Sequence, residues 1–283
     1  MISAIPLPYP FELEFMQRAL VAGLVVGIFA PMIGTFLVQK RMSLIGDGIG
    51  HVAFAGVGAG LVAGIYPVWT ALLFSVAGAL GIEWLRARRK ASGDLALALF
   101  FYSGIALGVV MASAKGGLGT SVIGFLFGQP LTVDAREVLV ILLLGALVVG
   151  VVIALRRALF AVVTDEDWSG VVGLPVRTLN GLLAVLTAVA VVAAMQIVGI
   201  LLIAALMVLP VATGQLLGRS FRGTLRIAVA VGVGSVLVGL ISSRLWGLAP
   251  GGAIVLVAAI VFLVVALLRH RMPGGSMLDV AER

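Results

Sequence analysis

An aspartate and a histidine four residues apart are the side chains in this sequence best suited to bind a cation. Asp47 and His51 lie in the run 46–51, which otherwise holds only glycine and isoleucine. On a helix, this spacing places both side chains on one face, about 6 Å apart. Mixed oxygen and nitrogen ligation suits manganese, iron or zinc, and the absence of cysteine removes the soft thiolates that copper(I) favours.

The residues around this pair are apolar, which raises the cost of placing a charge there. A carboxylate within hydrocarbon costs roughly 3 kcal/mol, so it normally faces a cavity, a partner or a ligand. An alternative role is structural, with Asp47 capping a helix and His51 making an interhelical hydrogen bond. Asp47 lies several residues beyond Lys40 and Arg41, and His51 lies well inside its apolar segment, which favours the ligand role.

Two ligands from one chain are too few to hold a transition metal. A twofold homodimer would supply two carboxylates and two imidazoles, a complete four-ligand set. Small residues along the same segment allow helices to approach closely. These are Gly46, Gly50, Gly56, Gly60 and Gly64.

The composition is that of a membrane protein. Of 283 residues, 62% are hydrophobic and only 11% are charged, whereas soluble domains carry about 25% charge. Apolar runs recur along the chain, so we expect residues 1–283 to form a single transmembrane domain in a lipid bilayer. The net charge of +7 is explained by basic membrane-flanking loops and does not indicate nucleic acid.

Apolar segments of about 20 residues predict an all-α polytopic fold with eight to nine transmembrane helices. The nine segments are 15–38, 43–64, 68–85, 95–114, 135–155, 179–197, 199–217, 226–246 and 252–268. With the N-terminus outside, fifteen Lys and Arg residues fall inside and four outside. This asymmetry predicts a multi-pass protein of the cell membrane with an external N-terminus and a cytoplasmic C-terminus.

Two connections are long enough to hold structure of their own. The outer one, Lys115 to Asp134, contains an apolar stretch from Val122 to Phe127 that predicts a short re-entrant or interfacial helix. The inner one, residues 156–178, carries three consecutive acids in a compartment whose other loops are basic.

The inner connection also predicts a short amphipathic helix, which begins near Asp167 and ends at Gly173 before a proline. Such a helix can dock on a partner protein. Alternatively, it is an ordinary interfacial helix anchored by Trp168.

The sequence lacks the motifs of an enzyme that would drive transport itself. It has no G-x-x-x-x-G-K-[ST] run to hold nucleotide phosphates. It also has no H-E-x-x-H pair, and its second histidine, His270, lies in a terminal basic cluster, which argues against a metalloprotease. An ATPase partner or an ion gradient must therefore supply the energy for any transport.

Three blocks occur in order along the chain. The first is Arg41-Met-Ser-Leu-Ile-Gly-Asp47 followed by His51, the second runs from Val198 to Thr213, and the third is Pro250-Gly-Gly-Ala253. Together these blocks resemble the membrane permease subunits of ABC-type zinc and manganese importers. The similarity covers nearly the whole chain.

This resemblance implies a homodimeric permease with a type II ABC importer-like fold. It implies two cytoplasmic ATP-binding subunits, an external metal-binding protein, and no cofactor other than the transported zinc or manganese. Asp47 and His51 match the residues that coordinate the ion. Asp167, Ser169 and Gly173 match the coupling loop that contacts the ATPase.

The function expected from these features is uptake of a divalent transition metal by an ATP-driven importer. The alternatives are a gradient-driven transporter in which Asp47 and His51 relay protons, and a membrane enzyme or scaffold in which they are structural. We expect the block from Gly199 to Thr213 to be a packed helix kinked at Pro210. Gln196 and Gln215 are expected to form interhelical hydrogen bonds.

Overall fold

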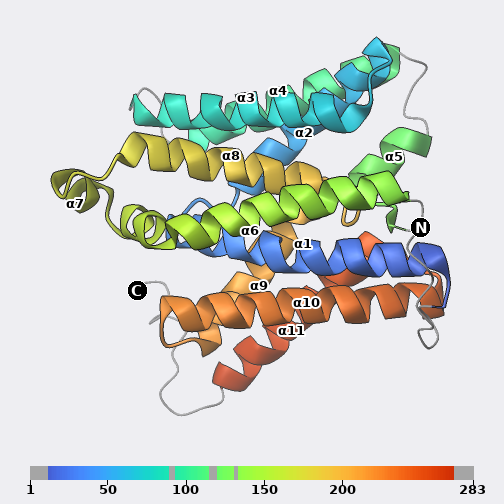
Figure 1. The fold of residues 1–283 in the computed structure, drawn as a ribbon. Helices are drawn as coiled ribbons and strands as arrows, with labels where there is room; N and C mark the ends of the chain where they lie inside the picture. Colours follow the sequence, from blue (N-terminus) through green and yellow to red (C-terminus); the bar gives the residue numbers. More distant parts are fainter. Residues whose placement is uncertain (1–11, 89–92, 115–119, 131–132, 271–283) are drawn as a thin grey trace.

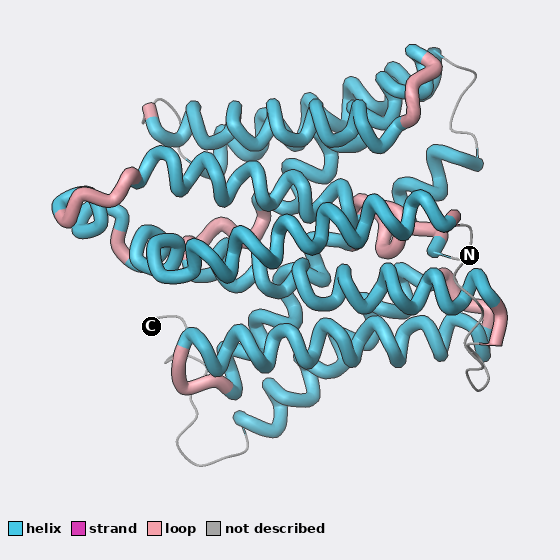
Figure 2. The backbone as a smooth tube through the Cα atoms, in the orientation of Figure 1, coloured by secondary structure: helices cyan, strands magenta, loops and turns pink. Residues whose placement is uncertain are grey.

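The computed structural model describes residues 12–88, 93–114, 120–130 and 133–270. Within these ranges the chain is helical, with short connections and no strand (Figure 2). The helices are α1 (Glu14–Gln39), α2 (Ile45–Ala63), α3 (Pro67–Ala87), α4 (Gly93–Ala114), α5 (Thr120–Phe127), α6 (Ala135–Thr164), α7 (Glu166–Val171), α8 (Val176–Ala194), α9 (Ile203–Leu217), α10 (Phe221–Trp246) and α11 (Pro250–His270).

The predicted all-α membrane fold is confirmed. Eight helices in the described part of the chain are long and apolar enough to cross a bilayer, and α9 is a shorter apolar helix. Each of the nine predicted segments corresponds to one of these helices, because long apolar runs identify spans directly. The short helix expected at Val122 to Phe127 is present as α5, while residues 115–119 and 131–132 of that connection lie outside the described residues.

The long helices run side by side, with α7 at one end of the bundle and α5 at the other (Figure 1). Of an 18-residue apolar stretch of α2, 78% is buried inside the bundle, whereas only 22% of the corresponding stretch of α4 is buried. Outer helices therefore present apolar side chains to lipid, while α1, α2 and α8 form the interior. We refer below to the α7 end and the α5 end of the bundle.

The predicted helices 179–197 and 199–217 are interrupted by a segment that is not helical. The helix α8 ends at Ala194 and α9 begins at Ile203, so residues 195–202 connect them as turns. Gly199 has φ 91°, and a Cβ there would lie 2.4 Å from the carbonyl carbon of Phe127. Only glycine fits this left-handed conformation and this close approach.

The polar backbone of this buried segment is satisfied by α5. Ile200 N donates to Phe125 O (3.0 Å), and Leu201 N donates to Leu126 O (3.2 Å). The last carbonyls of a helix have no partner within it, so each element satisfies the other. Non-helical backbone within a membrane protein is tolerated where such partners exist.

The connection at the α7 end is shorter than the predicted inner loop, residues 156–178. The helix α6 begins at a capping box formed by Asp134 and Glu137 and continues to Thr164. The helix α7 follows at once, because the side chain of Asp165 accepts a hydrogen bond from Trp168 N (2.8 Å).

Candidate functional site

The first part of α2 is covered by other helices on every face but one. Between Ile45 and Gly58, every residue is buried except Asp47 and His51. The spacing predicted that these two side chains share a helix face, and α2 is helical over both positions. This face is also the one that the remainder of the chain leaves partly open.

His51 lies well within the membrane-spanning part of α2. It is about 18 Å from the end of the helix at Ala63, at a rise of ~1.5 Å per residue. Its ring meets the ring of Phe101 on α4 edge to face, with centroids 4.3 Å apart. A Cβ at Gly104 would lie 2.7 Å from the backbone of His51, so α4 packs directly against α2 here.

The Nδ1 atom of His51 is buried and has no hydrogen-bond partner among the described residues. Leaving a buried polar atom without a partner costs about 1–3 kcal/mol. This nitrogen therefore lacks the interhelical hydrogen bond that a purely structural role for His51 would predict.

Asp47 does not cap α2 through its side chain. The N-cap position is Leu44, and no side-chain hydrogen bond closes this end of the helix. Within the described residues, no group of three or more His, Cys, Asp or Glu side chains converges on a metal position. One copy of the described chain thus supplies two candidate ligands at this place.

A cleft of about 610 Å³ opens at the start of α2, at the α7 end. Its walls include Leu44 and Ile45, the last turn of α3 around Arg86, and Asp94 and Leu97 of α4. The cleft lies next to the helical turn that carries Asp47, although Asp47 itself does not line it.

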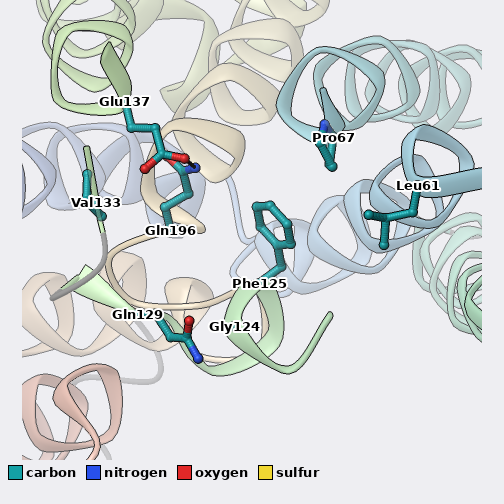
Figure 3. A pocket seen from close by; sticks show the side chains of 8 residues that line it. All are labelled: Leu61, Pro67, Gly124, Phe125, Gln129, Val133, Glu137 and Gln196. Carbon is teal, nitrogen blue, oxygen red and sulfur yellow. Dashed lines mark hydrogen bonds between the residues drawn. The ribbon is translucent and has the colours of Figure 1, made fainter. Parts of the chain in front are cut away.

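A second cavity, of about 330 Å³, lies at the other end of α2. Leu61 and Pro67 line one side of it, and Phe125 of α5 lines another. Figure 3 shows the Glu137 and Gln196 side chains meeting at its wall. The two cavities therefore lie at opposite ends of the helix that carries Asp47 and His51.

Hydrogen bonds to one carboxylate join three segments beside this second cavity. Glu137 Oε1 accepts hydrogen bonds from Tyr66 Oη (2.7 Å) and Gln196 Nε2 (2.8 Å). Burial raises the pKa of Tyr66, and the hydrogen bond to Glu137 raises it further. The prediction that Gln196 forms interhelical hydrogen bonds is confirmed.

Ion pairs fasten α7 to the transmembrane helices. Glu166 Oε1 lies 2.6 Å from Arg86 Nη2 at the end of α3 and 3.1 Å from Lys40 Nζ after α1. Lys40 also donates to Asn180 Oδ1 on α8 (2.6 Å). One carboxylate of α7 is thus linked to three transmembrane helices or their ends, including the turn that leads into α2.

Burial and charge act in opposite directions on this cluster. Burial lowers the pKa of Lys40, and the nearby charge of Arg86 lowers it further, while Glu83 and Glu166 oppose this effect. Burial raises the pKa of Glu166, but Lys40 and Arg86 outweigh it and hold that pKa below its ordinary value. The charges of Lys40 and Arg86 therefore favour the ionised form of Glu166.

The residues predicted for the coupling loop do not all face the same way. Asp167 and Gly173 are exposed, whereas Ser169 is fully buried on the side of α7 that faces the bundle. Sequence reasoning missed Val171, which is 86% exposed and beside the exposed Trp168. It also missed Glu166 as an anchor, although the acidic run in a basic compartment was the signal that pointed to it.

The fold and the site define a polytopic α-helical membrane protein with a partly open Asp-His face in the first turns of α2. The chain belongs to the ABC 3 transport family, which it matches over residues 12–269.

It is 33% identical to a manganese transport system membrane protein, MntC, of Listeria innocua, over 88% of this chain and 89% of the relative. It is 31% identical to a probable iron transport system membrane protein of Haemophilus influenzae, over 90% of this chain and 94% of the relative. Among solved structures, PsaBC from Streptococcus pneumoniae in complex with Fab matches with a TM-score of 0.81 and 30% identity, over 90% of this chain and 91% of that one.

Proposed function

We propose that this chain is the membrane-spanning permease subunit of an ATP-driven importer of divalent transition metal ions. The observation that supports this function most directly is the accessibility of Asp47 and His51. They are the only residues of α2 between Ile45 and Gly58 that remain partly open. Membership of the ABC 3 transport family agrees with this function.

The ion is the cargo, and its chemical class follows from the ligands. A carboxylate and an imidazole suit manganese, iron and zinc. The relatives named for manganese and for iron favour these two metals as substrates. Zinc fits the same pair of ligands and is distinguished from them by uptake competition.

The complete site requires a second copy of the chain. Asp47 and His51 supply two ligands, and they lie on the face of α2 that this chain leaves open. A twofold axis beside this face would bring four ligands together and would cover the exposed side chains. The homodimer is therefore part of the proposed site.

The cavities at the two ends of α2 suggest the route of the ion. The cavity at the α5 end would receive the ion from an external metal-binding protein. The cleft at the α7 end would release it toward the cytoplasm. The excess of Lys and Arg at the α7 end supports this orientation, with the N-terminus outside and the C-terminus inside.

The helix α7 is suited to contact the ATP-binding subunits. Trp168, Val171 and Val172 form an exposed apolar surface at its tip, and Asp167 and Gly173 flank it. Ser169 faces the bundle and would seat the helix, while Glu166 anchors it through Lys40 and Arg86. Movement of α7 would therefore reach the turn before α2 through Lys40.

Substitution of the two ligands tests the function. Asp47→Asn and His51→Ala should each abolish ATP-dependent manganese, iron or zinc uptake in cells or proteoliposomes, while the dimer still assembles. Glu14→Gln is the matched control, since Glu14 is also an acid in the first turn of a transmembrane helix. Full uptake by both site variants, or uptake without any ATPase, would contradict the proposal.

Substitution of the apolar tip tests the role of α7. Val171→Asp should reduce copurification of the ATP-binding subunit and uncouple ATP hydrolysis from uptake, because a charge would enter the contact surface. Leu248→Asp is the control, as Leu248 is exposed in the turn between α10 and α11. Unchanged copurification and uptake for Val171→Asp would exclude this surface as the contact.

A further inference from the structure

An apolar groove with a basic rim lies away from the Asp-His site, on the flank of the bundle. It has a volume of about 480 Å³ and is bounded by α1, α6 and the start of α10. Figure 1 shows these three helices side by side, with the start of α10 toward the α7 end. None of the residues proposed above for transport or coupling lines it.

An aromatic cluster from all three helices forms the apolar wall of the groove, and within it Phe36 is fully buried. The rings of Phe36 and Phe221 meet edge to face, with centroids 5.2 Å apart. The ring of Phe160 lies 4.7 Å from that of Phe221. Phe160 remains 39% exposed, so the groove offers a hydrocarbon chain an open apolar surface.

Three arginines line the same groove, and all three are exposed. They are Arg156, Arg157 and Arg222. Among the residues that the structure describes, no acidic side chain lies within ion-pair distance of any of them. Their charge is therefore available to an anion from outside the chain.

The groove lies at the depth where lipid headgroups begin. Arg156 and Arg157 end the uninterrupted apolar run that starts at Val138, and such a run covers most of the hydrocarbon core, which is about 30 Å thick. Ser220, the N-cap of the 26-residue helix α10, also lines the groove. The N-terminus of that helix adds a positive potential that favours phosphate.

We propose that this groove binds an anionic phospholipid. Its phosphate pairs with Arg156, Arg157 and Arg222, and one acyl chain lies against Phe160 and Phe221. Basic pockets between transmembrane helices bind anionic headgroups in this way. A free phosphate has no use for the aromatic wall, and a zwitterionic lipid gains little from three unpaired guanidinium groups, so the combination favours an anionic lipid.

Native mass spectrometry of the full-length protein in detergent tests this site. The probes are phosphatidylglycerol and phosphatidylcholine with identical acyl chains. The wild type should retain phosphatidylglycerol in preference to phosphatidylcholine and should gain thermal stability from it. Each of the variants Arg156→Gln, Arg157→Gln and Arg222→Gln should weaken phosphatidylglycerol binding about fivefold. This is the change in affinity expected when one basic residue near an anionic headgroup is removed.

Arg244→Gln is the matched control, because Arg244 is an exposed arginine in the last turn of α10, at the opposite end of the same helix. It should bind phosphatidylglycerol as the wild type does. Equal binding of the two lipids, loss of binding in the control, or equal stabilisation by inorganic phosphate would each overturn the proposal. Gel filtration of each single variant separates lost lipid binding from lost folding.

Discussion

The two ends of the bundle are held together by different kinds of interaction. At the α5 end, backbone groups of residues 195–202 bond to the last carbonyls of α5, and neutral donors bond to Glu137. At the α7 end, the links are ion pairs from Glu166 to Lys40 and Arg86. The first set depends on backbone geometry, and the second depends on charge.

This difference indicates where the protein can rearrange at low cost. Long charged side chains can exchange partners or water through movements of the side chains alone. Separating residues 195–202 from α5 would leave buried backbone groups without partners, each at about 1–3 kcal/mol. We therefore expect the α7 end to rearrange more readily than the backbone pairing at the α5 end.

The largest effect is expected from breaking the geometry at the α5 end. Gly199→Ala would place a Cβ 2.4 Å from the backbone of Phe127 at a φ of 91°. The strain should cost about 3 kcal/mol or more and lower the Tm of the purified protein in detergent.

Gly234→Ala is the control, because a Cβ at that α10 position would meet nothing within 4 Å. It should leave the Tm unchanged or raise it, since alanine is favoured over glycine in helices. An equal Tm for Gly199→Ala and the wild type would mean that the pairing of residues 195–202 with α5 does not stabilise the α5 end of the bundle.

The next effect is expected from removing the charge at the α7 end. Glu166→Gln leaves Lys40 buried with Asn180 as its remaining neutral partner. The Glu166 side chain is itself 40% exposed, so water screens the pair, and we expect a loss of about 2 kcal/mol of stability. Metal uptake by Glu166→Gln should fall by a larger factor than the amount of folded protein in the membrane.

Asp167→Asn is the control for the Tm comparison alone, since Asp167 is exposed and is in none of the ion pairs of the described residues. Raised salt should narrow the Tm difference between Glu166→Gln and the wild type, but not the difference caused by Gly199→Ala. A salt-independent Glu166→Gln effect would contradict the electrostatic account of the α7 end.

The sequence was sufficient to predict most of the helices and the shared face of Asp47 and His51. Length and hydropathy identify spans, and the four-residue spacing of the pair defines a common face on any helix. That this face is the open one in α2 depends on how α3, α4, α8 and α9 pack against it, which no local pattern encodes.

The segment 195–202 could not be predicted, because its residues are as apolar as those of a helix. Its non-helical form depends on α5, which lies about seventy residues earlier in the chain and supplies the backbone partners. The link from Glu166 to Lys40 is likewise tertiary. The only local sign of it was an acidic run among basic loops.

A smaller effect is expected from removing the Tyr66 hydroxyl at the α5 end. Tyr66→Phe deletes the donor to Glu137 Oε1 and the longer bond that Tyr66 Oη accepts from Gln196 Nε2 (3.3 Å), but it leaves the bond from Gln196 to Glu137. The expected loss is about 1 kcal/mol, measured as a Tm shift that does not change with salt. Tyr102→Phe, at a position 69% exposed on α4, is the control and should leave the Tm unchanged. An equal or larger Tm loss for Tyr102→Phe would mean that the hydrogen bonds of Tyr66 are not the cause of the Tyr66→Phe effect.

The smallest effect is expected from acid. Acid tests the charge of Glu166 at the α7 end without a substitution. The pKa of Glu166 is held below its ordinary value of 4.5, so its ion pairs stabilise the folded protein fully above that pH and lose this contribution as the pH falls through the depressed pKa.

Lowering the pH from about 7 to about 4 should therefore lower the Tm of the wild type more than that of Glu166→Gln. The decrease should be smaller than the effect of the substitution itself, because a protonated carboxyl group still forms hydrogen bonds. If Glu166→Gln and the wild type lose stability in parallel as the pH falls, the charge of Glu166 is not what secures α7.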